Sequence, residues 1–218
     1  MKIGILIPTR GDRTEFLKFA LEQMDRQTLK PDVIELVNDT PLSNDKDITW
    51  RYRIGCERLL SKDVDVVFLI EDDDYYADDY IECMVNAWEA AERPQIFGIG
   101  ETTYYHLELT SYNHHMHQER ASAFSTMLTA EGIRNMKWPA DNYVFTDIEL
   151  WKVLKGKTFI PYKCLALGIK GHKSGALFGG MGHLANKNLY KNRDLELNWL
   201  KSNINETAFN FYKTYLNK

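Results

Sequence analysis

The chain lacks any hydrophobic run near the length of a membrane span, which needs about 18 consecutive apolar residues. Its 218 residues are 44% hydrophobic and 27% charged, which is ordinary for a soluble globular protein. The stretch from Met1 to Pro8 is too short and too strand-like for a secretion signal. We therefore expect one cytoplasmic domain with no transmembrane segment, large enough to bury a full core.

Two kinds of motif are also missing. The three cysteines, Cys56, Cys83 and Cys164, lie far apart without a C-x-x-C pair, which indicates reduced and buried thiols. The turn after the first predicted strand, residues 8–13, contains neither G-x-G-x-x-G nor a Walker motif. ATP hydrolysis and NAD chemistry are therefore disfavoured.

The net charge is only −4, but the charges are separated along the chain. Residues 63–92 carry eleven acids and no base, whereas residues 151–193 carry eight lysines and Arg193 and no acid. This asymmetry indicates a bipolar site, with a cation on one side and a polyanion on the other. The alternative is that the lysine-rich stretch is simply a solvated face.

In the first half of the chain, strand patterns alternate with helical patterns. The strand patterns cover 2–8, 32–38, 64–70 and 95–101, and the helical patterns cover 12–27, 47–61 and 78–92. A capping box of Asp12 and Glu15 is expected to open the first helix. The alternation predicts an α/β fold with βαβ units, a mainly parallel sheet and flanking helices.

The second half is less regular. It shows strand patterns at 102–109 and 123–128 and helical patterns at 129–136, 147–154 and 194–216. Six of the thirteen glycines lie between Gly168 and Gly182, which predicts a mobile loop.

Four consecutive acids, Glu71 to Asp74, directly follow the apolar strand pattern at 64–70. Open α/β folds bind ligands at the carboxyl edge of the sheet, where these acids are expected to lie. Clustered carboxylates repel one another unless a cation lies among them, and hard divalent cations prefer carboxylate oxygens. The pattern therefore favours a Mn²⁺ or Mg²⁺ site over a solvated acidic turn.

Several segments together carry a family resemblance: Ile5–Arg10, Leu17, Ala20–Leu21, Gln27, Leu36–Asp39 and Phe68–Asp74. Their order and spacing resemble the amino-terminal half of a family 2-type glycosyltransferase with the GT-A fold. The resemblance covers residues 3–82 well and the remainder loosely. It implies one GT-A domain over residues 1–218, with a nucleotide-sugar-binding half at 1–101. The acceptor-binding half would be 102–218, ending in a helix.

This resemblance implies metal-dependent, inverting transfer of a sugar from a nucleoside-diphosphate sugar to an acceptor hydroxyl. The positions that match nucleotide-sugar contacts are Pro8, Thr9, Arg10, Asp39, Arg53 and Asp72. Asp73 matches the direct metal ligand, with Asp72 beside it and Asp74 open as an alternative register. A late histidine completes the metal shell in many such enzymes, so His172 is expected there, with His183 as the rival.

Asp147 matches the catalytic base of this family, although Thr146 replaces the usual acid before it. An acid at a helix start, near a metal-held leaving group, would be placed to deprotonate an acceptor hydroxyl. The alternative is a helix acid favoured only by the dipole. Asp141 and Glu149 are the other candidates for the base.

Other functions stay open at this point. The His114-His115-x-His117 sequence lacks the ordered partners of a zinc site, so we expect a surface or acceptor-loop role. A nucleotidyltransferase of sugar phosphates would need a Gly-rich turn with Arg after the first strand, and a calcium module would need the central Gly and final Glu of an EF-hand loop. The acceptor is expected to be a glycan or, given the lysines of 151–193, hydroxylated bases of phage-like DNA.

Overall fold

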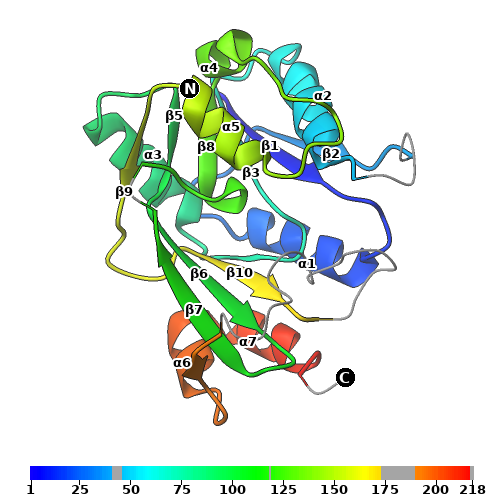
Figure 1. Ribbon diagram of the computed structural model, residues 1–218, viewed down its shortest axis with the longest axis vertical. Helices are drawn as coiled ribbons and strands as arrows, with labels where there is room; N and C mark the ends of the chain where they lie inside the picture. Colours follow the sequence, from blue (N-terminus) through cyan, green and yellow to red (C-terminus); the bar gives the residue numbers. More distant parts are fainter. Residues whose placement is uncertain (41–45, 118, 173–189, 217–218) are drawn as a thin grey trace.

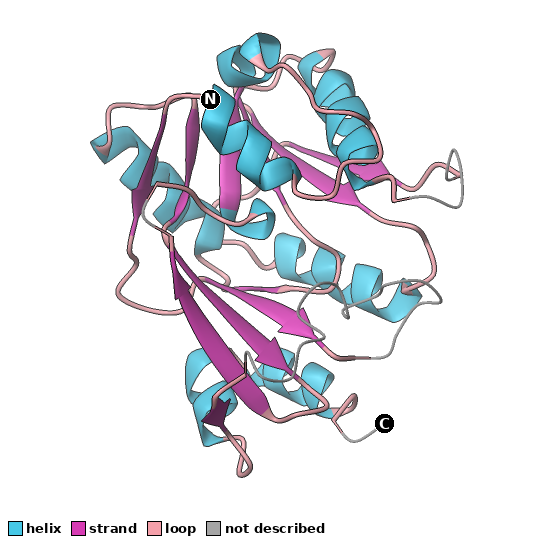
Figure 2. Cartoon of the chain, in the orientation of Figure 1, coloured by secondary structure: helices cyan, strands magenta, loops and turns pink. Residues whose placement is uncertain are grey.

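The computed structural model describes residues 1–40, 46–117, 119–172 and 190–216, arranged as two sheets with helices around them (Figures 1 and 2). The larger sheet has the order β2-β1-β3-β8-β5-β9. Its strands are β1 (Ile3–Pro8), β2 (Val33–Val37), β3 (Val66–Leu69), β5 (Ile96–Ile99), β8 (Thr126–Thr129) and β9 (Gly156–Phe159). β1 pairs in parallel with β2 and β3, and β5 with β9, whereas β8 runs antiparallel to both of its neighbours. The predicted mainly parallel α/β sheet is confirmed.

Alternate residues of the central strands point to opposite faces of this sheet, and helices cover both faces, so that each face forms a buried core. Ile5 and Phe68 join a core that includes residues of α1 (Thr14–Asp25) and α3 (Tyr80–Ala90). Leu6 and Val67 join a second core with α2 (Ile48–Leu60), α4 (Ala130–Asn135) and α5 (Thr146–Val153). Gly55 allows α2 to lie close to the sheet, because a Cβ there would come within 2.0 Å of Leu6 Cδ1.

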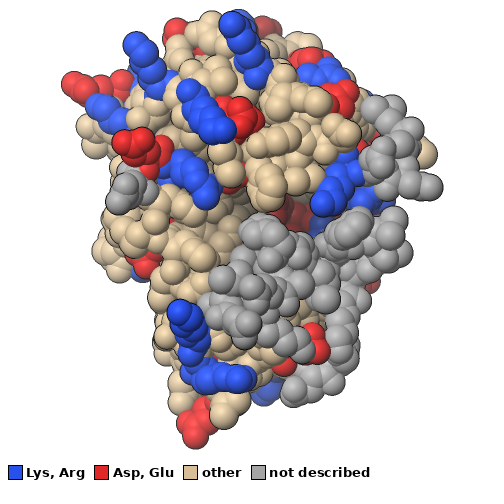
Figure 3. All heavy atoms as spheres, in the orientation of Figure 1, with Lys and Arg blue, Asp and Glu red and all other residues tan. Residues whose placement is uncertain are grey.

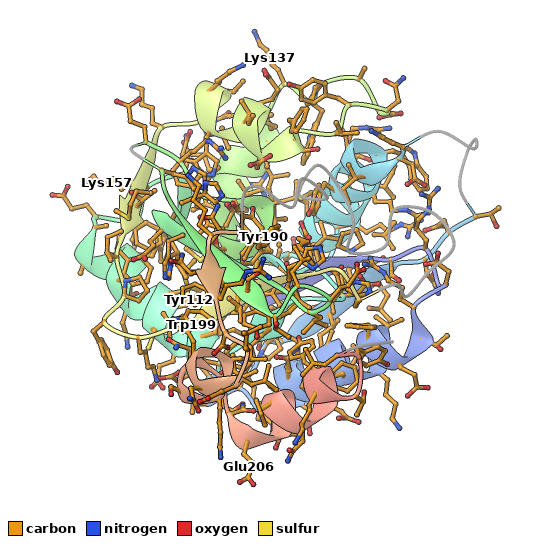
Figure 4. All side chains as sticks on the ribbon, turned by 60° about the horizontal axis from the view of Figure 1, so that its bottom comes forward. Tyr112, Lys137, Lys157, Tyr190, Trp199 and Glu206 are labelled. Carbon is orange, nitrogen blue, oxygen red and sulfur yellow. The ribbon has the colours of Figure 1, made fainter. Side chains whose placement is uncertain are left out.

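A second sheet with the order β11-β7-β6-β10-β4 lies beside the larger one (Figure 1). Its strands are β4 (Tyr75–Tyr76), β6 (Glu101–His106), β7 (Ser111–Met116), β10 (Ala166–Lys170) and β11 (Asn192–Arg193). Two helices, α6 (Asn198–Asn203) and α7 (Glu206–Lys213), lie at this end of the molecule. Trp199 of α6 stacks on Tyr112 of β7, with ring centroids 4.0 Å apart (Figure 4).

Three sequence predictions about local structure need correction. The capping box of Asp12 and Glu15 is wrong, because Arg13 is the N-cap of α1 and makes no side-chain cap bond. The long C-terminal helix is instead two helices, because the Asn205 side chain accepts a hydrogen bond from Ala208 N and starts α7 anew. The glycine-rich stretch begins inside strand β10, and most of it, with His183, lies outside the described residues.

The three cysteines are free thiols, with Cys56 buried and the other two half-buried. Within the described ranges, the helices are all too short or too polar to cross a bilayer.

Candidate functional site

The four acids lie directly beyond the end of β3, and they are not a solvated turn. Asp72, Asp73 and Asp74 are 2%, 3% and 0% exposed, and Glu71 is half-buried. Burial of this many carboxylates requires compensating cations or hydrogen bonds. The buried strand therefore delivers the acids into the interior, at the edge where the two sheets meet (Figure 1).

Three basic side chains meet this acidic cluster, defined as Glu71 to Asp74. Arg13, which immediately precedes α1, donates from Nη1 to Asp73 Oδ2 and from Nη2 to Asp72 Oδ1, both at 2.5 Å. Lys170 at the end of β10 lies 3.5 Å from Asp74 Oδ1 and 3.9 Å from Glu71 Oε2. His172 Nε2 lies 3.0 Å from Asp73 Oδ2. The basic groups thus come from segments about 60 and 96–99 residues away in the chain.

Burial and charge act differently on each acid of the cluster. Burial raises the pKa of Asp72 to about 7 and raises the pKa of Asp74 and Glu71 as well. Burial also opposes ionisation of Asp73, but the charges of Arg13 and Lys170 outweigh it and lower its pKa. Asp73 is therefore the firmly ionised member of the cluster, and its neighbours bind protons more readily than ordinary carboxyl groups.

The donor set fits a hard divalent cation. Glu71, Asp73 and Asp74 each offer an oxygen atom, and these atoms all lie within 4.8 Å of one another. Asp74 Oδ2 is buried and has no hydrogen-bond partner among the described residues. When all four carboxylates are ionised, Arg13 and Lys170 balance only half of their charge. A divalent ion would balance the remainder, and oxygen-only ligation suits Mn²⁺ or Mg²⁺.

This donor set differs in emphasis from the residues singled out by sequence. Asp73 is common to both sets. Asp72 is bonded to Arg13 instead, and the triad is completed by Glu71 and Asp74. His172 contacts Asp73 directly, and its role as a metal ligand stays a prediction.

The acidic cluster opens into a cavity of about 790 Å³, and Figure 3 shows a hollow near the middle of one face with acidic atoms in its depth. The cavity walls include residues from the turn after β1, α2, the acidic cluster, β6, β7 and the loop after it, the start of α5 and the end of β10: Pro8, Thr9, Arg10, Arg13, Arg51, Tyr52, Glu71, Asp73, Tyr104, His115, His117, Arg120, Thr146, Asp147 and Lys170. Its size matches sites for small molecules and cofactors.

One wall of the cavity is the turn after β1, and Arg51 fixes its shape. Arg51 is only 1% exposed and donates to the carbonyl oxygens of Thr9 at 2.8 Å, Val37 at 2.7 Å and Asp39 at 3.0 Å. It also pairs with Asp47 at 2.8 Å. Sequence reasoning missed this residue, although its position in the same helix as Arg53 made it a candidate.

Two predicted nucleotide contacts lie away from the cavity wall. Both carboxylate oxygens of Asp39 accept from Arg58 at 2.9 Å, and this contact lowers the pKa of Asp39. Arg53 is bound through Nη2 to both oxygens of Asp141 at 3.1 Å. By contrast, Pro8, Thr9 and Arg10 do line the cavity.

The wall formed by the start of α5 contains Asp147, the predicted base. Arg120 Nη1 donates to Asp147 Oδ2 at 2.9 Å, and the Asp147 side chain is 19% exposed. The other two candidate bases lie outside the wall: Asp141 is paired with Arg53 and Glu149 with Lys152. Asp147 is thus the candidate that the fold brings into the same cavity as the acidic cluster.

The histidines His114, His115 and His117, in and just after β7, do not all point the same way, because alternate residues of a strand face opposite sides. His114 contacts Thr103 and Glu101, whereas His115 and His117 line the cavity. Burial and the charge of Arg120 lower the pKa of His115, and they lower that of His117 to about 4. These two imidazoles are therefore neutral hydrogen-bonding groups at neutral pH.

The lysine-rich stretch does not gather into one basic surface where the structure describes it. Lys152 pairs with Glu149 in the same helix, Lys157 and Lys163 pair with the distant acids Glu92 and Asp79, and Lys170 contacts the acidic cluster. Figure 3 likewise shows acidic and basic side chains intermixed on one face.

No protein-family model matches the chain, and no curated protein matches it. Crystal structures of S. aureus TarS share its fold. One aligns with a TM-score of 0.56 at 10% identity, covering 78% of this chain and 37% of TarS. TarS 1–349 in complex with UDP-GlcNAc aligns at 0.53 and 9% identity, covering 78% and 59%, and its complex with UDP at 0.50 and 12%, covering 79% and 62%.

The chain therefore spans between 37% and 62% of the length of these TarS chains. At such low identity the likeness shows the fold, and the predicted GT-A architecture is confirmed by it.

Proposed function

We propose that this protein transfers a glycosyl group from a nucleoside-diphosphate sugar to an acceptor hydroxyl, with Mn²⁺ or Mg²⁺ as cofactor. The observation that carries the proposal is the buried acidic cluster at the carboxyl end of β3, which shares one cavity with the β1 turn and Asp147. A fold shared with a protein that has been crystallised with UDP-GlcNAc and with UDP supports this choice of donor.

In this proposal the metal is held by Asp73 with Glu71 and Asp74, the three residues whose oxygens converge. When bound, the ion would stabilise negative charge on the diphosphate leaving group. Before the ion binds, Asp72 holds Arg13 against Asp73, and the His172 imidazole contacts Asp73 directly.

The remaining roles follow from the cavity walls. Pro8, Thr9 and Arg10 contact the nucleoside side of the donor, in a turn whose carbonyl Arg51 fixes. Asp147 takes the proton from the acceptor hydroxyl, so that the hydroxyl displaces the diphosphate directly with inversion. Residues 1–101 supply most of the donor site, and residues 102–218 supply the acceptor wall.

Calorimetric titration with UDP- and GDP-sugars, in Mn²⁺ and in EDTA, tests this function. We expect metal-dependent binding that Asp73→Asn abolishes and that Asp78→Asn, a surface control paired with Arg26, leaves unchanged. Asp147→Asn is expected to bind the donor but to lose turnover.

Four other results bear on the assignment. Tight binding of nucleoside triphosphates and not of nucleotide sugars would favour a nucleotidyltransferase. Absence of any nucleotide binding would contradict the proposal. A strongly salt-dependent affinity for DNA would identify a nucleic-acid acceptor, whereas no DNA binding at low salt would leave a glycan or another small hydroxyl compound.

A further inference from the structure

The positive charge of Arg13 occupies the carboxylates of Asp72 and Asp73, to which a metal ion would also be attracted. Its two terminal nitrogens bridge Asp72 and Asp73, and the bonded side chains are 1% and 4% exposed. The Arg13 side chain is 16% exposed and belongs to the wall of the cavity. It is therefore both the bonded partner of the central metal ligand and a group that a cavity-bound molecule can reach.

The bridging position is incompatible with an ion bound at the same oxygen. Asp73 Oδ2 already accepts from Arg13 at 2.5 Å and lies 3.0 Å from His172 Nε2. A divalent cation on this carboxylate would stand close to a permanent positive charge in a buried environment, where repulsion is weakly screened. Either the ion binds weakly or the guanidinium moves away.

The anion that would attract a displaced Arg13 is the diphosphate of the donor. Arg13 and the carboxylates of Glu71 and Asp73 line the same cavity, and a guanidinium fork matches phosphate oxygens as well as carboxylates. Three of the four residues before it, Thr9, Arg10 and Asp12, line that cavity too.

The geometry points to an exchange in which Arg13 neutralises Asp72 and Asp73 until a divalent ion enters, and then binds the diphosphate that the ion brings. This inference rests on the proposed function and adds to it a diphosphate-binding residue that couples metal binding to donor binding. Without the diphosphate, Arg13 opposes the metal. With the diphosphate present, Arg13 contributes to binding it, so each ligand raises the affinity for the other.

The test uses two binding measurements on Arg13→Gln, which keeps a hydrogen-bonding side chain but removes the charge. Mn²⁺ affinity without nucleotide is measured by electron paramagnetic resonance of the free ion. Affinity for UDP and for GDP is measured by calorimetry at saturating Mn²⁺. The control is Arg26→Gln at the other end of α1, where Arg26 pairs with Asp78.

We expect Arg13→Gln to bind Mn²⁺ about tenfold more tightly and the nucleoside diphosphate about tenfold more weakly, within the usual range of coupling between two ligands. Arg26→Gln should match the wild type in both. A purely structural ion pair would instead weaken both affinities together when it is lost. Arg13→Lys keeps the charge but not the two-pronged guanidinium, so its affinities for Mn²⁺ and for the nucleoside diphosphate should lie between those of the wild type and Arg13→Gln. It provides the same comparison if Arg13→Gln does not fold.

Unchanged or weaker Mn²⁺ binding in Arg13→Gln would overturn the exchange, as would an unchanged nucleotide affinity. If the wild type binds a nucleotide sugar with Mn²⁺ and the variant does so equally well, the exchange fails while the proposed function stands. If no form of the protein binds nucleotide, both fail.

Discussion

Replacing Arg51 by Met should destabilise the protein strongly, because one buried guanidinium joins two strand ends. The substitution removes its bonds to the carbonyls of Thr9, Val37 and Asp39 and leaves the Asp47 carboxylate, 8% exposed, without this cation. Breaking a buried pair by removing one partner costs about 3–5 kcal/mol. In a domain of this size about 1 kcal/mol shifts Tm by roughly 2–4 °C, so we expect a fall of roughly 6–20 °C.

Urea unfolding in metal-free buffer, followed by circular dichroism, measures this loss of stability. The matched control is Arg53→Met, two residues further along α2, because Arg53 is partly exposed and its ion pairs with Glu57 and Asp141 should contribute less than about 1 kcal/mol. A loss below about 1 kcal/mol for Arg51→Met would refute the role assigned to the buried guanidinium.

Three further predictions concern the site and its support. Because burial raises the pKa of Asp72 to about 7, a proton opposes the metal below that pH. Mn²⁺ affinity measured by calorimetry should therefore rise as the pH increases from 5.5 to 8, and the rise should flatten in Asp72→Asn; an equal affinity across this range would contradict the assignment. Asp147→Asn should lower kcat by about 10²–10⁴-fold, as expected for loss of a general base, with little change in donor affinity, and near-normal turnover would exclude Asp147 as the base. Gly55→Ala should cost about 1–3 kcal/mol by overpacking, because its Cβ would meet Leu6, and an unchanged urea midpoint would refute this close contact.

The strands and helices of the first half could be predicted from the spacing of hydrophobic residues. β1 and β3, for example, are buried apolar runs bounded by turns. In the second sheet only β6 largely falls within a predicted strand pattern, at 102–109, because the other strands are short or lack a hydrophobic alternation. β7 reads Ser-Tyr-Asn-His-His-Met, without a hydrophobic alternation, and β4 has only two residues. β4 pairs with β10, whose residues lie 90 or more positions later in the chain, and β10 pairs with β6, 64 residues before it.

The acidic cluster was predictable because a run of acids after an apolar strand is a local pattern. Its compensating cations were not, since Arg13 and Lys170 lie about 60 and 96 residues away from the acids that they contact. Arg51 was not predicted for the same reason. In the sequence it is an ordinary helical arginine, and only the fold brings it into contact with the carbonyl oxygen of Thr9, 42 residues away. Asp39 was a local prediction too, and only the fold shows its carboxylate paired with Arg58.

Anomalous diffraction at the manganese edge, from crystals grown with Mn²⁺ and UDP or GDP, tests the central claim most directly. We expect a single strong peak between the carboxylates of Glu71, Asp73 and Asp74, in contact with the diphosphate, and Arg13 turned from Asp73 toward the phosphate oxygens. A nucleotide bound in the cavity with no manganese peak at these acids, and with Arg13 still bridging Asp72 and Asp73, would contradict the account.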